Sequence, residues 1–207
     1  MKVILVNGSP KPAGCTFTAL GEIQSALENN GIQTEIFQLG TKPISGCIDC
    51  KACRNNNAPC PLDNLVKDFS VKAKSADALV FGSPVHYAAA SGGVTSFMDR
   101  LFFSNPGAFK GKVGAAIVSC RRAGSTAAID QLNKYFSINQ MPIASSQYWP
   151  MVHGYTPDDV RQDAEGMQTM RVLGNNIAWM LKCIDAGKKA GITFPDQEKR
   201  EWTNFIR

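Results

Sequence analysis

The sequence predicts an α/β protein in which helices cover both faces of one open, doubly wound parallel sheet. Two observations support this fold class. Short apolar runs, typical of buried strands, alternate along the chain with longer stretches in which apolar residues recur every three or four positions, as in amphipathic helices. Loops containing Gly, Ser or Pro follow several of the apolar runs. Such alternation produces βαβ units, whose right-handed crossovers give a parallel sheet.

The length and composition are those of one globular domain spanning residues 1–207. The chain has 207 residues, of which 44% are hydrophobic and 19% charged, as in ordinary folded domains. The formal net charge of +5 suits a phosphorylated small ligand and is too weak to indicate nucleic acid binding. No apolar run reaches the roughly 18 residues of a membrane span, and Val3–Val6 is too short for a signal peptide. We therefore expect a cytoplasmic protein without a nucleic acid or membrane partner.

The first half of the chain supplies three predicted strands and two helices. Val3–Val6 is an apolar run that ends in the turn signal Asn-Gly-Ser-Pro. A helix is predicted over 16–29, because its apolar residues lie three and four positions apart. Residues 34–39 alternate between polar and apolar, which is typical of a strand. After a helix over 65–74, the apolar run 76–81 forms the third strand and ends in Gly-Ser-Pro.

The second half continues the alternation with two more strands and three helices. A helix over 91–101 precedes the apolar strand 113–118, and a second Gly-containing loop then leads into a helix over 126–136. A short fifth strand is predicted around 142–145. A long carboxyl-terminal helix over about 159–186 completes the set.

Three loops lie where an open parallel sheet binds its ligands. Such sheets bind ligands beyond the carboxyl ends of the strands, at the point where the strand order reverses. The loops that follow the first, third and fourth predicted strands are therefore the candidates, and they cover residues 8–16, 82–93 and 119–126.

The first of these loops, GSPKPAGCT over 8–16, has the features of a phosphate site. Glycine and short side chains let backbone N–H groups approach an anion, Ser9 and Thr16 offer hydroxyls, and Lys11 adds a positive charge. The helix that follows contributes its unpaired N–H groups and the positive end of its dipole. The loop is neither G-x-G-x-x-G nor a Walker A motif. The alternative is a plain strand-to-helix turn in which a Ser or Thr caps the helix.

Two motifs resemble those of the NAD(P)H-dependent FMN reductases of the flavodoxin-like superfamily. GSPKPAGCT resembles the family's opening motif, GSPRxxGNT, and GSPVHYAAASGGVTSFMDRL is similar to its second motif, GSPVYxxxxSxxxKxFxDR. The resemblance implies a flavodoxin-like five-stranded sheet in the order 2-1-3-4-5, with FMN in the loops at its carboxyl edge. It implies that the FMN phosphate is bound by the first loop, through Ser9, Lys11, Gly14, Cys15 and Thr16.

The chain departs from both motifs at one position each. Cys15 replaces the usual Asn, so its backbone N–H would still serve the phosphate while the amide side-chain contacts would be lost. We expect a thiol at a helix amino terminus to have a lowered pKa. Thr95 replaces the usual Lys, so the role of that charge in the family does not carry over.

The second and third loops would enclose the flavin ring. The resemblance implies that the isoalloxazine lies against Pro84, Val85, His86, Tyr87 and Ala88. His86 is a candidate proton donor, although hydride transfer to flavin N5 does not require one, and Tyr87 is alternatively a core aromatic residue.

In the third loop, SCRRAGST, the resemblance implies contact with the pyrimidine edge of the flavin. Arg121 or Arg122 could stabilise negative charge near N1 of the reduced flavin, or meet a phosphate of NADPH. Gly124 would supply the turn, and Ser119 would contribute from the strand end. The alternative is a solvated basic loop.

A Cys-rich insertion at about 45–61 is the most unusual feature of the chain. It has four cysteines, with two residues between each of the first three and six before the fourth: Cys47, Cys50, Cys53 and Cys60. This compressed spacing favours a [4Fe–4S] cluster over zinc, whose ligands usually come in two separated pairs. It is also similar to the motif of the iron–sulfur flavoproteins. Zinc and free or redox-active thiols are the alternatives.

Two functions follow from these resemblances. The first is an FMN-dependent oxidoreductase in which hydride passes from NAD(P)H to flavin N5, and electrons then pass to a quinone, a nitro or azo compound, free flavin or a protein. The alternative is an iron–sulfur flavoprotein, an electron carrier with FMN and a [4Fe–4S] cluster that is reduced by ferredoxin. The resemblance also implies a homodimer or homotetramer. A third reading is a binding module for another phosphorylated ligand.

Overall fold

The computed structural model describes residues 1–55 and 59–205 and shows the α/β architecture that the sequence predicts. Five parallel strands lie in the order β2-β1-β3-β5-β6, and the short β4 pairs antiparallel with β3. Counted along the chain, the parallel strands therefore have the predicted order 2-1-3-4-5. The strands are β1 Lys2–Asn7, β2 Gln33–Gln38, β3 Ala78–His86, β4 Ala89–Ala90, β5 Val113–Cys120 and β6 Met151–His153.

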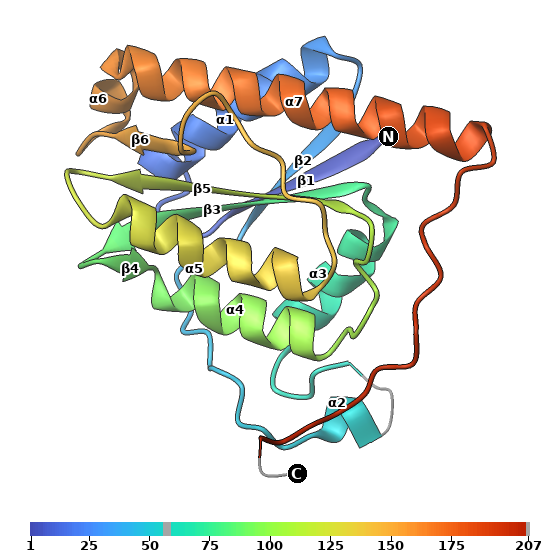
Figure 1. Ribbon diagram of the computed structural model, residues 1–207. Helices are drawn as coiled ribbons and strands as arrows, with labels where there is room; N and C mark the ends of the chain where they lie inside the picture. The colour runs from blue at the N-terminus through green and yellow to red at the C-terminus, as the bar shows by residue number, and fades with distance from the viewer. Residues whose placement is uncertain (56–58, 206–207) are drawn as a thin grey trace.

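Helices cover both faces of this sheet (Figure 1). Helices α1, α6 and α7 lie over one face, and α3, α4 and α5 lie over the other. The helices are α1 Cys15–Asn29, α2 Ala52–Asn55, α3 Asn64–Ser75, α4 Gly92–Phe103, α5 Ser125–Ile138, α6 Pro157–Gln162 and α7 Ala164–Lys189. None of those in the described residues is long and apolar enough to cross a membrane.

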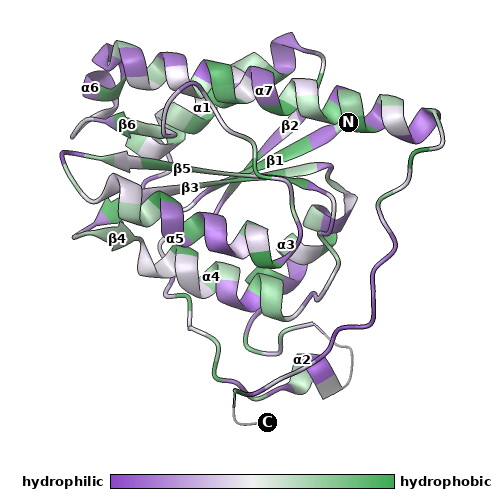
Figure 2. Cartoon of the chain, viewed as in Figure 1, coloured by the Kyte–Doolittle hydropathy of each residue, from purple (hydrophilic) through white to green (hydrophobic). Residues whose placement is uncertain are grey.

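The core consists of two apolar layers, one on each side of the sheet. Side chains alternate along a strand, so Val3 and Leu5 of β1 pack toward α1 and α7, whereas Ile4 and Val6 pack toward the opposite helices. Because both faces are covered, the central strands are continuous apolar runs rather than alternating ones. Figure 2 shows this concentration of hydrophobic residues in β1, β3 and β5.

The predicted fifth strand at 142–145 is wrong. That segment forms only one isolated bridge, between Ile143 and Gly114, and the strand that extends the sheet is β6. Beyond this bridge the chain bonds to α7 instead of continuing along β5, since Ser146 Oγ donates to the Thr169 carbonyl at 2.7 Å. The Ser145 carbonyl likewise accepts a hydrogen bond from an α7 side chain. Pro142 accepts from the Gly114 N–H at 2.9 Å but has no N–H of its own to donate to β5.

The predicted carboxyl-terminal helix is two helices that meet at Asp163. The Asp163 carboxylate accepts hydrogen bonds from the backbone N–H of Gly166 at 2.9 Å and of His153 at 2.7 Å. The side chain thereby caps α7 and ties its start to β6, which turns the chain between α6 and α7. Beyond α7, residues 190–205 run along the molecule without helix or strand (Figure 1).

Candidate functional site

The first and second predicted loops meet at the carboxyl edge of the sheet. The backbone N–H of Gly8 donates to the Gly82 carbonyl at 2.9 Å, which joins the ends of β1 and β3. A Cβ atom on Gly8 would lie 2.0 Å from Cγ2 of Val94 and 2.6 Å from the Gly82 oxygen. Only glycine therefore allows the first loop to lie this close to β3 and α4.

Asn7 and Gln38 hold the first loop in shape, and the sequence analysis missed both. The Asn7 side chain accepts from the backbone N–H of Ser9 and donates to the Lys11 carbonyl, each at 3.2 Å. The Gln38 amide donates to the Ser9 carbonyl at 2.6 Å. The position of Asn7 at the end of a buried strand was the available signal, because a polar side chain there must find partners.

The amino terminus of α1 opens onto this loop without a side-chain cap. Its N-cap is Gly14, and no side-chain oxygen accepts a capping hydrogen bond from the backbone N–H groups of the first turn. The alternative of a Ser- or Thr-capped turn is therefore wrong. Lys11 is exposed, whereas the buried Thr16 hydroxyl pairs with the Ser119 hydroxyl at 2.8 Å. The loop thus presents backbone donors and one lysine, which suits an anion.

Cys15 does not have the lowered pKa that its position at a helix start predicts. Burial raises the pKa of the Cys15 thiol, and this outweighs the lowering by its backbone hydrogen bond and by Lys11. The thiol lies 3.8 Å from the carbonyl oxygen of Gly154. The structure thus places Cys15 in a packed position beside the loop.

The second loop is a hairpin that projects from the sheet edge. Strand β3 continues to His86 and turns back through β4, where Val85 pairs with Ala90. Tyr87, at the turn, has a φ of 57° and a fully exposed ring, so the alternative of a core aromatic residue is wrong. His86 and Ala88 are also exposed, and Pro84 and Val85 are half-buried.

The third loop lies against this hairpin. Gly124 has a φ of 86°, and a Cβ there would lie 2.8 Å from Cα of Ala88 and 3.0 Å from Cγ1 of Val85. Arg121 and Arg122 are exposed in the turn that precedes it. The structure therefore brings all three predicted loops together at one edge of the sheet.

A hollow of about 290 Å³ lies at this edge, between the first loop, the second loop and a segment that the sequence analysis did not single out. The new wall is the chain that follows β2, where Thr41 and Lys42 are exposed. No recognised motif marked that wall. The lining residues are Gly8, Pro10, Leu39, Gly40, Thr41, Lys42, Pro43, Ile44, His86, Ser91 and Gly93.

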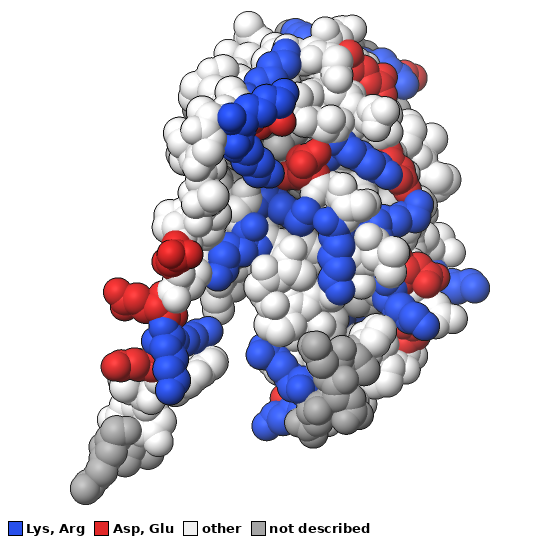
Figure 3. Space-filling model, turned by 90° about the vertical axis from the view of Figure 1, so that its right-hand side faces the viewer, with Lys and Arg blue, Asp and Glu red and all other residues white. Residues whose placement is uncertain are grey.

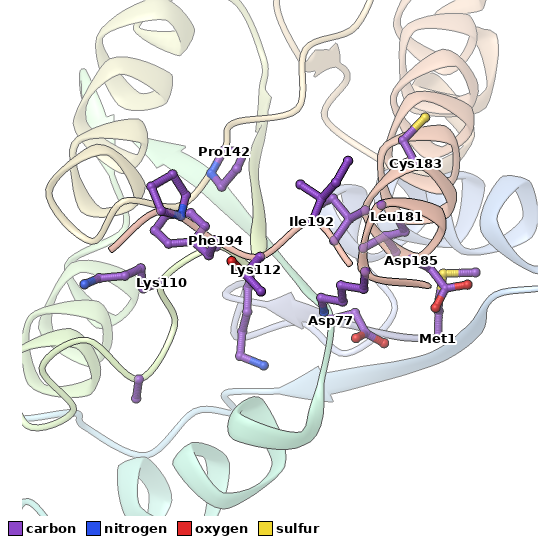
Figure 4. A pocket seen from close by; sticks show the side chains of 17 residues that line it. Met1, Asp77, Lys110, Lys112, Pro142, Leu181, Cys183, Asp185, Ile192 and Phe194 are labelled. Atoms are coloured by element: carbon purple, nitrogen blue, oxygen red, sulfur yellow. The ribbon is translucent and has the colours of Figure 1, made fainter. Parts of the chain in front are cut away.

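A larger hollow of about 670 Å³ lies at the opposite edge, between the end of α7 and the chain that follows it (Figure 4). Figure 3 shows this side of the molecule, where Lys and Arg side chains gather. Burial lowers the pKa of Lys112, whose ammonium donates to the Lys74 carbonyl at 3.0 Å. Met1 and Asp77, at the amino ends of β1 and β3, line the hollow, so it is not at the ligand edge of a parallel sheet.

The four cysteines of the insertion line one small hollow at the carboxyl end of α4. Cys47 and Cys50 are exposed, Cys60 is half-buried and Cys53 is buried. Burial, and then the neighbouring Cys60, raise the pKa of Cys53. In residues 1–55 and 59–205, no three His, Cys, Asp or Glu side chains are grouped so that they could hold a metal ion. The structure thus gives the cysteines a common surface without gathering them into a ligand set.

Arg100, which the sequence analysis did not assign to this site, forms part of the same wall. Its side chain is fully buried, and Nη1 donates to Asp63 Oδ2 at 2.6 Å. This hydrogen bond holds the pKa of the Asp63 carboxyl below its usual range. Nε donates to Cys60 Sγ at 3.3 Å. A buried cation therefore contacts the sulfur-lined hollow directly.

The chain is similar to known proteins over most of its length. The family model for NADPH-dependent FMN reductases matches residues 1–156. An iron–sulfur flavoprotein of Methanocaldococcus jannaschii is 33% identical over 193 residues, which are 89% of this chain and 99% of the relative. An iron–sulfur flavoprotein of Archaeoglobus fulgidus is 27% identical over 194 residues, 88% of this chain and 98% of the relative.

Solved structures support the fold. An archaeal flavodoxin has a TM-score of 0.59 and 21% identity, covering 88% of this chain and 99% of its own. FerB, a flavoenzyme NAD(P)H:(acceptor) oxidoreductase from Paracoccus denitrificans, has a TM-score of 0.63 and 15% identity, covering 88% of this chain and 97% of its own. The protein thus belongs to the NADPH-dependent FMN reductase family, in its iron–sulfur flavoprotein branch, and is an FMN-dependent oxidoreductase with a flavodoxin-like fold.

Proposed function

We propose that the protein is an iron–sulfur flavoprotein that carries electrons between a [4Fe–4S] cluster in the Cys-rich insertion and FMN at the three loops. The observation that carries this proposal is the position of α4. Its first residues adjoin the second loop, and Arg100 and Phe103 near its end line the four-cysteine hollow. With 12 residues, α4 is about 18 Å long at 1.5 Å per residue.

The first loop suits the phosphate of FMN. The uncapped start of α1 offers backbone N–H groups, and Gly8 keeps the loop close to β3. We propose that the Gly14, Cys15 and Thr16 backbone N–H groups bind the phosphate. Ser9 would shape the loop through its hydrogen bond to the backbone N–H of Lys11, and the Lys11 ammonium would supply charge.

The second and third loops suit the flavin ring. FMN, when bound, supplies hydride and one-electron chemistry through its isoalloxazine. We propose that the hairpin residues Pro84, Val85, His86, Tyr87 and Ala88 contact the ring, with Gly124 fixing the distance between the loops. Arg121 and Arg122 would provide positive charge on the pyrimidine side. Ser119 would support the first loop through the hydrogen bond between its hydroxyl and that of Thr16.

The donor set of the insertion fits a [4Fe–4S] cluster. Cys47, Cys50, Cys53 and Cys60 are free thiols on a shared hollow, and thiolates are the usual ligands of such clusters. Gathering the sulfurs would require this segment to close around the cluster.

A cluster of this kind supplies electrons one at a time, which favours a protein donor such as ferredoxin. The net charge of +5 is complementary to an acidic protein of that type. The match to NADPH-dependent FMN reductases over residues 1–156 favours a second candidate. In it, NAD(P)H gives hydride to flavin N5, and a quinone, a nitro or azo compound, free flavin or a protein accepts the electrons.

We further propose a homodimer or homotetramer in the cytoplasm. The exposed aromatic rings Tyr148, Trp149 and Trp179 are large apolar surfaces of the kind enriched in interfaces. Sedimentation velocity of the FMN-loaded protein should show a dimer or larger. A monomer throughout the micromolar range would refute this assembly.

The cluster proposal is tested by iron analysis of matched cysteine variants purified without oxygen. Cys50→Ser should lose most of its iron and keep FMN, because only the insertion is changed. Cys183→Ser, which alters an exposed cysteine on α7, should keep both. Wild-type protein without iron after anaerobic reconstitution, or full iron in Cys50→Ser, would overturn the assignment. Flavin bleaching by NADPH in Cys50→Ser would support the second candidate.

A further inference from the structure

Arg100 stands at the boundary between the protein core and the four-cysteine hollow. Its side chain is fully buried, although it carries a charge. Arginine is almost never fully buried unless its charge is paired, because removing the ion from water is costly. The partners of its N–H donors therefore indicate what the residue serves.

One side of the guanidinium is occupied by the protein frame. Nη1 donates to Asp63 Oδ2 at 2.6 Å and to the Ser45 carbonyl at 3.3 Å. The other carboxylate oxygen of Asp63 caps α3 by accepting from the Val66 N–H at 3.4 Å. Arg100 thus joins α4 to the start of α3 and to the chain just before Cys47. The hydrogen bonds of Nη1 alone would give Arg100 a purely structural role.

The other side of the guanidinium faces sulfur. Nε donates to Cys60 Sγ at 3.3 Å, whereas Nη2 is fully buried and has no partner among the described residues. In a planar guanidinium, the Nε–H and one Nη2–H point in the same direction. The Nε–H that bonds to Cys60 and the Nη2–H that has no acceptor therefore lie side by side in the wall of the hollow. A buried donor left without a partner is unfavourable, which indicates a further acceptor.

We propose that Arg100 is a positioning residue for the [4Fe–4S] cluster. Its Nε–H holds the Cys60 thiolate, and its Nη2–H meets a second sulfur of the same cluster. This inference rests on the proposed function, since it requires the cluster. Reduction adds one electron, and thus one negative charge, to a group that thiolates already make anionic. A buried cation with two N–H donors stabilises the reduced form and raises its reduction potential. No proton leaves the guanidinium.

The test is the midpoint potential of the cluster, measured by an EPR-monitored redox titration of anaerobically purified holoprotein. Arg100→Gln removes the positive charge and the paired Nε–H and Nη2–H donors. The matched control is Lys51→Gln. It also removes a positive charge from the lining of the four-cysteine hollow, but the Lys51 side chain is 61% exposed. Arg100→Lys keeps a positive charge opposite Asp63 but lacks the paired donors. It therefore replaces Arg100→Gln in the measurement if Arg100→Gln does not fold. FMN content and thermal unfolding report the fold of each variant.

At the wild-type midpoint, we expect the ratio of reduced to oxidised cluster to fall at least tenfold in Arg100→Gln, about 59 mV for a one-electron couple. Arg100→Lys should shift in the same direction by less. Lys51→Gln should change the ratio less than about threefold, because water and salt screen an exposed charge. A wild-type potential in folded, iron-loaded Arg100 variants would overturn the inference, as would an equal shift in Lys51→Gln. Wild-type protein without iron would instead refute the proposed function.

Discussion

Gly124 lies so close to Ala88 that a Cβ atom on the glycine would stand 2.8 Å from the alanine Cα. This approach joins the third loop to the hairpin of the second loop, and it occurs at a φ of 86°, which L side chains rarely adopt. The two loops that we propose for the flavin ring are thereby fixed relative to each other by one glycine.

Gly124→Ala should weaken FMN binding without unfolding the protein. Strain at the positive φ and the contact with Ala88 together cost about 1–3 kcal/mol, so the hairpin should shift and the FMN Kd should rise about tenfold. Flavin fluorescence quenching measures this. Gly21→Ala is the matched control, because a Cβ at Gly21 meets nothing within 4 Å. Equal Kd values in both variants would contradict a role for Gly124 in joining the loops.

Lys11→Ala should weaken the binding of FMN more than that of riboflavin. The lysine is exposed on the loop that we propose for the phosphate, so its loss should cost about 1 kcal/mol, or roughly fivefold in Kd, and less at high salt. The comparison of the two flavins isolates the phosphate contact. Lys67→Ala, which alters an exposed lysine of α3, should change neither affinity. An equal loss for both flavins would place the effect of Lys11 elsewhere.

Asp63→Asn should destabilise the protein at neutral pH and lose that effect in acid. The hydrogen bond from Arg100 lowers the pKa of Asp63 in the folded state, so its contribution is present above the unfolded pKa of about 3.9 and disappears as the pH falls through the folded value. We expect about 1–2 kcal/mol at pH 7 after allowing for the partial exposure of Asp63. Urea unfolding of both proteins from pH 7 to pH 3 measures the difference. A pH-independent difference would contradict this linkage.

Cys15 should react slowly with iodoacetamide near neutral pH. Burial raises the pKa of its thiol, so little of the nucleophilic thiolate is present, and the side chain is half-buried. The exposed Cys183 on α7 provides the comparison within the same molecule. Peptide mass spectrometry over a time course should show Cys183 alkylated well before Cys15. Faster alkylation of Cys15 would show an activated thiol and reverse the conclusion drawn from burial.

The sequence predicted those parts of the fold that depend on local patterns. Apolar runs such as Val3–Val6 and the turn signals that follow them identified four of the five parallel strands and the three loops. The fifth strand could not be placed, because the choice between 142–145 and β6 depends on hydrogen bonds that Ser145 and Ser146 make with α7. The break at Asp163 likewise depends on the distant N–H of His153.

The candidate site was predictable where motifs mark it and not where side chains far apart in sequence meet. The phosphate loop is visible in GSPKPAGCT, but its support by Gln38 depends on the pairing of β2 with β1. The spacing of the cysteines suggested a cluster, yet nothing in the sequence connects Arg100 with Cys60, 40 positions away. The pKa of Cys15 was predicted in the wrong direction, because burial at that position is a property of the packed structure.

We propose that electrons pass between the Cys-rich insertion and FMN within this protein. This transfer can be measured by anaerobic titration with reduced ferredoxin, followed at the flavin absorbance, in wild-type protein and in Cys50→Ser loaded with equal FMN. We predict that the wild-type flavin bleaches and that the flavin of Cys50→Ser stays oxidised on the same timescale. Equal bleaching of both proteins, or no bleaching of iron-loaded wild type, would show that electrons do not reach FMN through the insertion.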